Sequence, residues 1–97
     1  MKIDKTFENG TLVVAVQGRL DTTTAPQLEA ALTDLSGIDL LVLDMNNLDY
    51  ISSAGLRVIL KAQKIMNAQG ALKLKNVCES VMEIFDITGF SDFLTIE

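Results

Sequence analysis

The chain contains no histidine, no tryptophan and only one cysteine among its 97 residues. Without histidine, neither a histidine-based catalytic triad nor a metal site of the common His/Cys kind can be assembled. The single cysteine, Cys78, cannot form an internal disulfide, which is typical of a protein from a reducing compartment. The composition therefore predicts a protein that is not an enzyme and that needs no metal or other cofactor.

Long apolar runs and phosphate-binding loops are also missing. Residues 1–5 lack the apolar core of a signal peptide, and no later apolar run approaches the roughly 20 residues that cross a bilayer. Neither a G-x-x-x-x-G-K-[ST] loop nor a G-x-G-x-x-G turn occurs, so the usual nucleotide sites are not expected. The formal net charge of −5 disfavours partners rich in phosphate, such as nucleic acids or anionic membranes. We expect a complete, cytoplasmic chain with no nucleic-acid or membrane partner.

Apolar side chains are abundant, at 48% of the sequence. A chain of 97 residues with this content can bury a core without disulfides or metals, and it lies in the size range of one domain. No linker, repeat or low-complexity tract interrupts it. The sequence therefore predicts one domain over residues 1–97.

The first half of the chain shows a hairpin followed by a helix. Residues 2–8 alternate between apolar and polar side chains, residues 11–17 are rich in valine and leucine, and Asn9-Gly10 between them favours a type I′ turn. Residues 18–23 are expected to break the second strand. A capping box at residues 24–27 then predicts a helix from Thr24, with an apolar stripe as far as Leu35 and an end at Ser36-Gly37.

The second half alternates strands with helices. Residues 38–45 form a nearly continuous apolar run, which indicates a central strand covered on both faces, and residues 46–52 are expected to be a loop. Residues 53–69 show the stripe of the longest helix, with Gly70 as its left-handed terminal residue. A strand over 72–77, a short helix closed by Thr88-Gly89 and a last strand over 93–96 follow.

This order of elements predicts an α/β fold with a mixed, mostly parallel sheet, an antiparallel N-terminal hairpin at one edge and flanking helices. In such a sheet, ligands usually bind at the loops that leave the carboxyl ends of the strands. The loops at residues 21–24 and 46–53 should lie together at that end, which would gather hydroxyls and carboxylates around Ser53.

Several side chains near these loops have two interpretations. Ser53 is either a plain helix N-cap or a hydroxyl that accepts a phosphoryl group at the positive end of the helix dipole. Asp21 either stabilises its own turn or contacts a partner. Gly55 either packs against the sheet or admits the backbone of a partner. Arg57, together with Lys61 and Lys64, forms a basic stripe that is either a solvated face or a surface for an acidic partner.

Three segments together resemble the STAS domain family, and specifically the stand-alone bacterial anti-sigma factor antagonists. They are Gly-Arg-Leu-Asp at residues 18–21 before a threonine-rich helix start, Tyr-Ile-Ser-Ser-Ala-Gly-Leu at 50–56, and Val-Met-Glu-Ile-Phe-Asp-Ile-Thr-Gly-Phe at 81–90. Their order and spacing span almost the whole chain. The resemblance implies a mixed sheet with an N-terminal hairpin and flanking helices, in agreement with the pattern above.

The resemblance also implies a function. Members of this group bind an anti-sigma factor that is also a serine kinase, release the sigma factor, and are inactivated when the kinase phosphorylates a serine at the start of the second helix. Ser53 matches that serine. The usual family pattern has Asp before it, whereas this chain has Ser52, so Ser52 is the alternative acceptor. The alternative function is a STAS scaffold of a transporter-associated or sensory complex that is not phosphorylated.

The resemblance implies that Asp21 contacts a partner, rather than only stabilising its own turn. The predicted partner is an anti-sigma factor serine kinase, and the chain itself is expected to be a monomer or a weak dimer. The residues predicted to contact the partner come from the two loops and from the start of the second helix: Asp21, Thr22, Thr23, Ser52, Gly55, Leu56 and Arg57.

Overall fold

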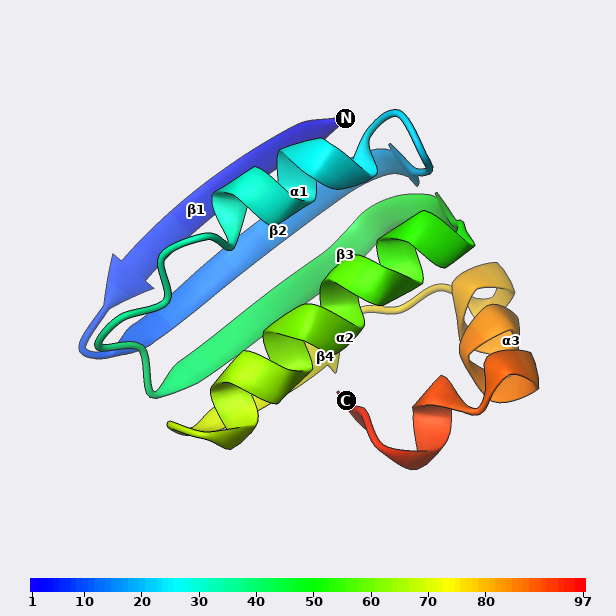
Figure 1. Ribbon diagram of the computed structural model, residues 1–97. Helices are drawn as coiled ribbons and strands as arrows, with labels where there is room; N and C mark the ends of the chain where they lie inside the picture. Colours follow the sequence, from blue (N-terminus) through cyan, green and yellow to red (C-terminus); the bar gives the residue numbers. More distant parts are fainter.

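Five strands, three α-helices and one 3-10 turn make up the fold in a computed structural model that describes all residues 1–97 (Figure 1). In chain order the elements are β1 (Lys2–Glu8), β2 (Thr11–Leu20), α1 (Ala25–Ala31), β3 (Leu40–Ile51), α2 (Ser53–Asn67), β4 (Ala71–Lys75), α3 (Glu79–Thr88), η1 (Phe90–Asp92) and β5 (Thr95–Ile96). None of the three helices is both long enough and apolar enough to span a bilayer.

The strands form one sheet in the order β1-β2-β3-β4-β5. β1 runs antiparallel to β2, and every other neighbouring pair is parallel. Asn9 and Gly10, which join β1 to β2, have φ values of 51° and 81°, as a type I′ turn requires. The predicted mixed sheet with its N-terminal hairpin is therefore confirmed.

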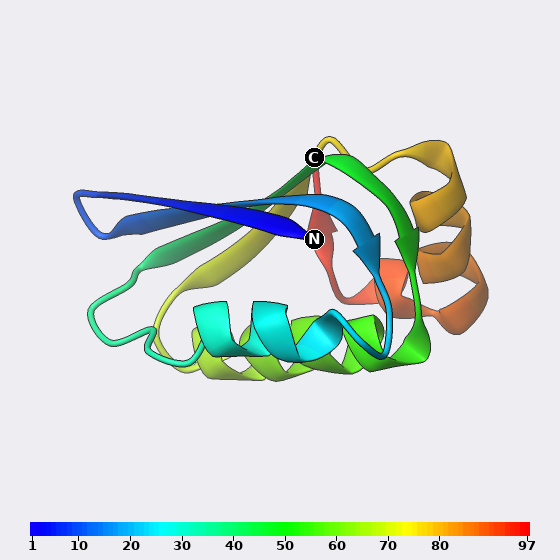
Figure 2. The same ribbon diagram turned by 90° about the horizontal axis from the view of Figure 1, so that it is seen from above.

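Helices cover only one face of this sheet. α1 and α2 lie side by side beneath it, while α3 lies beside the far end of β3 (Figure 2). The core fills the space between, where Val14, Leu43 and Leu74 from three strands meet Leu28 and Ile59 from the helices, all fully buried. The prediction that the central strand is covered on both faces is wrong. On the uncovered face of β3, Val42 is buried outside the main core cluster, whereas Leu40 and Asp44 are only partly buried.

Two strands run further than the sequence predicted. β2 continues to Leu20 and β3 continues to Ile51, so residues expected to be loops pair in the sheet. The pairing of β2 with β3 continues because its register shifts twice, between Ala15 and Gln17 and between Gly18 and Arg19. Each shift accommodates one extra residue of β3. Such bulges bend a strand without ending it. The sequence predicted a loop over this part of β3 because its residues are largely polar.

Helix α1 is a full turn shorter than predicted. It ends at Ala31, although Leu32 and Leu35 beyond it are as buried as the stripe predicted. The irregular segment that follows is held by the Gln69 side chain, whose Nε2 donates to the backbone oxygens of Leu35 at 2.6 Å and Ile38 at 2.8 Å. The periodicity therefore predicted which side chains enter the core but not the backbone that carries them there.

The glycines at the ends of the other helices have different roles. Gly89 ends α3 with φ 81°, as predicted. α2 ends at Asn67, and Gly70 does not have the left-handed conformation predicted for it. A Cβ at Gly70 would instead overlap the backbone carbonyl oxygen of Asp39. Gly70 is therefore required by a close backbone approach at the start of β4.

Candidate functional site

The loops that leave β2 and β3 meet at one end of the sheet, as predicted. The Ser52 N–H donates to the carbonyl oxygen of Leu20 at 2.8 Å, which extends the pairing of the two strands into the loops. This bond fixes the start of α2 against the start of the turn that precedes α1. Both candidate loops are therefore held by the sheet itself.

Ser52, rather than Ser53, is the N-cap of α2. Ser52 has an extended backbone (φ −101°, ψ 175°), and its Oγ accepts from the Gly55 N–H at 3.5 Å. Ser53 is the first helical residue; it is exposed, and its hydroxyl makes no hydrogen bond within the chain. The interpretation of Ser53 as a plain cap is therefore wrong. Its hydroxyl is free at the positive end of a 15-residue helix.

Asp21 organises the turn between β2 and α1. Its Oδ1 accepts from the Thr23 hydroxyl at 2.7 Å and from the backbone N–H groups of Thr23 at 2.9 Å and Thr24 at 3.1 Å. The Thr24 hydroxyl, which was expected to cap α1, donates to the backbone oxygen of Arg19 at 2.7 Å instead. The local interpretation of Asp21 is therefore confirmed. Its second oxygen, Oδ2, makes no hydrogen bond or ion pair within the chain. Contact of Asp21 with a partner stays a prediction.

The turn carries a pH dependence. The Thr23 hydroxyl, with the N–H groups of Thr24 and Thr23, holds the pKa of the Asp21 carboxyl below its ordinary value despite some desolvation. A lowered pKa contributes stability that is present above about pH 4 and is lost as the pH falls through the folded-state pKa. In thermal melts, the stability advantage of wild type over Asp21→Asn should shrink between about pH 5 and pH 2. Asp4→Asn is the control, and an equal change in both variants would contradict the prediction.

Gly55 and Leu56 lie beneath the site. Both are buried, and a Cβ at Gly55 would come within 2.6 Å of Cγ of Leu20 and 3.0 Å of Cγ1 of Ile51. The packing interpretation of Gly55 is therefore supported. These two residues seat α2 on the strand ends and expose little surface, and their contact with a partner stays a prediction. The other members of the predicted contact set, Thr22, Thr23 and Arg57, are exposed.

The sequence analysis assigned no role to Arg19 and Tyr50, which stand beside the two loops. They are opposite each other in β2 and β3, and the Arg19 guanidinium carbon lies 4.2 Å from the centre of the Tyr50 ring. Such a cation–π contact holds the guanidinium over the ring. Both residues fall inside the segments that carry the family resemblance, and that position is the signal by which they could have been found.

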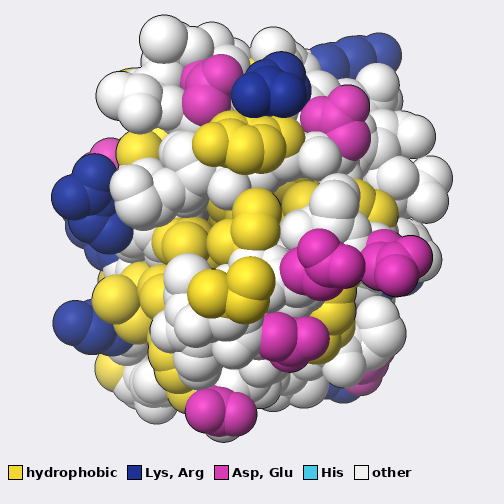
Figure 3. Space-filling model, turned by 90° about the vertical axis from the view of Figure 1, so that its right-hand side faces the viewer, with side chains coloured by type: hydrophobic (Ala, Val, Ile, Leu, Met, Phe, Trp, Pro, Cys, Tyr) yellow, Lys and Arg dark blue, Asp and Glu magenta, His cyan; other side chains and the backbone are white.

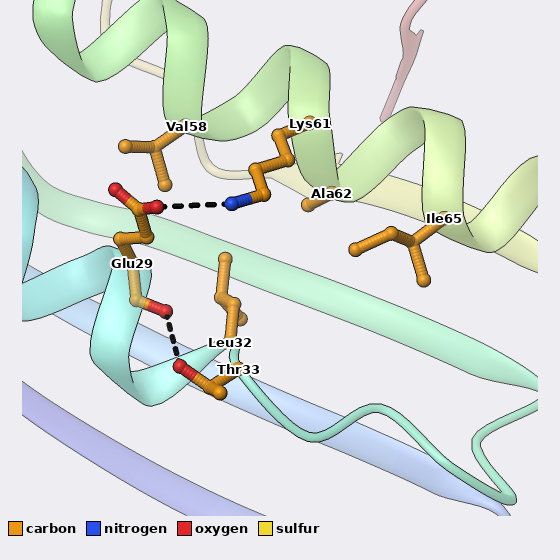
Figure 4. Close-up of a pocket in the computed structure, with 7 residues that line it drawn as sticks. All are labelled: Glu29, Leu32, Thr33, Val58, Lys61, Ala62 and Ile65. Atoms are coloured by element: carbon orange, nitrogen blue, oxygen red, sulfur yellow. Dashed lines mark hydrogen bonds and ion pairs between the residues drawn. The ribbon is translucent and has the colours of Figure 1, made fainter.

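A groove between α1 and α2 leads away from the site. Its first part, a cavity of about 340 Å³, brings Thr22 of the Asp21 turn together with Arg57 of α2. Its second part, of about 230 Å³, is lined by Leu32, Val58 and other side chains of both helices (Figure 4).

An ion pair of 3.0 Å between Lys61 Nζ and Glu29 Oε1 spans this groove (Figure 4). The basic stripe on α2 is consequently interrupted: Lys61 is paired within the chain, whereas Arg57 and Lys64 make no ion pair. No group of three or more His, Cys, Asp or Glu residues is arranged to hold a metal.

The family model described as STAS domain matches residues 2–97 of the chain. BtrV of Bordetella bronchiseptica, a candidate anti-sigma factor antagonist, is 42% identical over 93 residues, which cover 93% of this chain and 80% of BtrV. The anti-sigma-B factor antagonist of Bacillus subtilis is 32% identical over 99 residues, which cover 99% of this chain and 90% of that protein.

Solved structures have the same fold. The anti-sigma factor antagonist SpoIIAA in its unphosphorylated form superimposes with a TM-score of 0.84 at 18% identity, over 99% of this chain and 88% of that one. The Bacillus cell fate determinant SpoIIAA in its phosphorylated form gives a TM-score of 0.76 at 17% identity, over 99% and 91% of the two chains. The five-stranded α/β architecture is thus the one found in these proteins.

Proposed function

The chain belongs to the STAS domain family, and on that premise we propose that it acts as an anti-sigma factor antagonist: it binds an anti-sigma factor and so releases a sigma factor. The observation that carries the proposal is the 42% identity to BtrV over 93% of the chain. The name of the Bacillus subtilis relative agrees with it. Such a function requires binding, not catalysis, and would place the chain in the bacterial cytoplasm.

We further propose that the anti-sigma factor is a serine kinase and that Ser53 is its acceptor. The support is geometric: Ser52 is engaged as the helix cap, whereas the Ser53 hydroxyl is exposed and unbonded. The unphosphorylated and phosphorylated forms of SpoIIAA, which shares the fold, are consistent with a switch of this kind. In this scheme the kinase supplies ATP and metal, and the chain supplies only the hydroxyl.

The switch would operate by charge at the interface. A phosphate on Ser53 adds about −1.5 to −2 charge at the positive end of the α2 dipole, so the fold tolerates it. Docking, however, would have to bury that charge close to the Asp21 turn, and desolvating a charge that gains no partner across the interface is costly. Arg57 lies one helical turn beyond Ser53 on the same face, where it would pair with the phosphate rather than with a partner. Phosphorylation would therefore weaken binding without unfolding the domain.

Mass spectrometry after incubation with the cognate anti-sigma factor and ATP tests this proposal. Wild type and Ser52→Ala should each gain one phosphate on Ser53, and Ser53→Ala should gain none. Ser52→Ala is the matched control because it removes the neighbouring hydroxyl and costs only the cap, about 0.5–2 kcal/mol of stability. Phosphate on Ser52 alone would transfer the role to the alternative acceptor. If the chain bound this partner but gained no phosphate, the alternative of an unphosphorylated STAS scaffold would be favoured.

A further inference from the structure

The net charge of the chain is confined to its last quarter. Residues 1–75 contain eight acidic and eight basic side chains, whereas residues 76–97 contain five acidic side chains and no basic one. The formal charge of −5 therefore belongs entirely to the segment that forms α3, η1 and β5. This segment adjoins the end of β3, where the Ser80 hydroxyl donates to the Asp49 carbonyl oxygen at 3.4 Å, but none of its residues belongs to the Ser53 loop or lines the α1–α2 groove.

Most of these carboxylates have no cation to pair with. Glu97 forms an ion pair of 3.2 Å with Lys73, and the only other ion pair in the chain, between Lys61 and Glu29, is elsewhere. The remaining four acidic residues, on α3 and η1, are exposed and unpaired: Glu79, Glu83, Asp86 and Asp92. Their negative potential is consequently not cancelled within the molecule.

Apolar side chains are exposed among these carboxylates. Ile87 on α3 is 84% exposed and Phe93, just after η1, is 46% exposed; Phe7 on β1 is the only other large apolar residue exposed in the chain. Phe93 stacks against Phe90, with ring centroids 4.9 Å apart. Figure 3, which views the side of the molecule that carries α3, shows apolar side chains gathered in the middle of this face, with acidic side chains to their right and below and basic ones along the left edge and at the top.

The core does not need the exposed apolar residues of α3. Val81 and Phe85, on the inner side of the helix, are fully buried and anchor it to the sheet. Ile84 lies three residues before Ile87, so the two are neighbours on the helix surface, and Ile84 is only partly buried. An exposed apolar cluster that lies among unpaired carboxylates of its own elements is typical of a surface for another protein.

We propose that this surface, the α3–η1 face, binds a basic amphipathic segment of a partner protein. The face comprises apolar Ile84, Ile87, Phe90 and Phe93 and acidic Glu83, Asp86 and Asp92. Apolar side chains of the segment would pack on the first group, and its Lys or Arg side chains would pair with the second. The acidic rim selects a basic partner because like charges would be repelled. A second copy of this chain fits less well. Its unpaired cations on α2, Arg57 and Lys64, have no exposed large apolar residue beside them, and on β1 only Lys5 lies on the same strand face as the exposed Phe7.

The test is an NMR titration of the ¹⁵N-labelled chain with a synthetic helical peptide that has lysines on one face and leucines on the other. Saturable shifts should concentrate in residues 79–93. The double variant Glu83→Lys/Asp86→Lys should bind at least about tenfold more weakly, because two attractions become repulsions. Asp4→Lys/Glu8→Lys, on β1, makes the same change in net charge and should bind as wild type does. Equal weakening by both pairs would overturn the proposal.

A second variant isolates the apolar contribution. Ile87→Ser should weaken peptide binding without altering the fold, because this side chain is 84% exposed. Unchanged binding would reduce the surface to a diffuse charge effect and would also overturn the proposal. Self-association that depends on concentration and is abolished by Glu83→Lys/Asp86→Lys would overturn the proposal as well, because it would show that a second copy of the chain occupies this face. Ser53→Asp should bind the peptide as wild type does. The peptide proposal and the proposed Ser53 switch can therefore be refuted independently of each other.

Discussion

The Ser53→Asp variant is expected to bind its cognate anti-sigma factor about a hundredfold more weakly than wild type, whereas Ser53→Ala should bind as tightly as wild type. A hundredfold loss corresponds to about 2.7 kcal/mol, within the range of coupling between a modification and a binding site. The physical reason is that docking would desolvate a carboxylate that has gained no partner across the interface. Isothermal titration calorimetry with the purified anti-sigma factor measures both affinities.

Two controls separate charge from size and from stability. Ser53→Asn has the shape of the aspartate but no charge, so it should bind much more tightly than Ser53→Asp. An acidic residue in the first turn of a helix is favourable by about 0.3–1 kcal/mol, so Ser53→Asp should be at least as stable as wild type in urea unfolding. Equal affinity of the Ser53→Asp and Ser53→Ala variants would contradict the switch at this position.

The Gly70→Ala variant is expected to lose at least about 3 kcal/mol of unfolding free energy, at the upper end of what overpacking costs. The new methyl group would overlap the backbone carbonyl oxygen of Asp39. This carbonyl cannot move away cheaply, because it accepts from the Ala71 N–H at 3.0 Å at the start of the β3–β4 pairing. Urea unfolding followed by far-UV circular dichroism measures the loss.

Gly37→Ala is the matched control for that experiment. Gly37 has φ 77°, and a Cβ there would meet no atom within 4 Å. Alanine should therefore cost only the strain of the left-handed backbone, about 1–2 kcal/mol. If Gly70→Ala cost no more than Gly37→Ala, the close backbone approach would not be the reason for glycine at residue 70.

The sequence by itself determined the features that depend on near neighbours. Asn9-Gly10 predicted its turn, and Gly89 predicted the end of α3, because a positive φ is a local requirement that few residues meet. The alternation of apolar runs predicted the order of strands and helices, and Leu32 and Leu35 were correctly expected in the core. The three segments that carry the family resemblance were likewise recognisable from the sequence alone, and the family model matches residues 2–97.

Only the tertiary structure decided the features that depend on residues far apart in the chain. β2 and β3 extend to the site because each pairs with the other past two bulges, which no local pattern encodes. Gly55 and Gly70 are glycines because Leu20 and Asp39, distant in sequence, approach them too closely for a side chain.

A contact between residues far apart in the chain also decides which of the two serines, Ser52 or Ser53, caps α2. The Ser52 N–H is held by the Leu20 carbonyl of a neighbouring strand. Ser52 is therefore the cap, the helix begins at Ser53, and the Ser53 hydroxyl is exposed and makes no hydrogen bond within the chain.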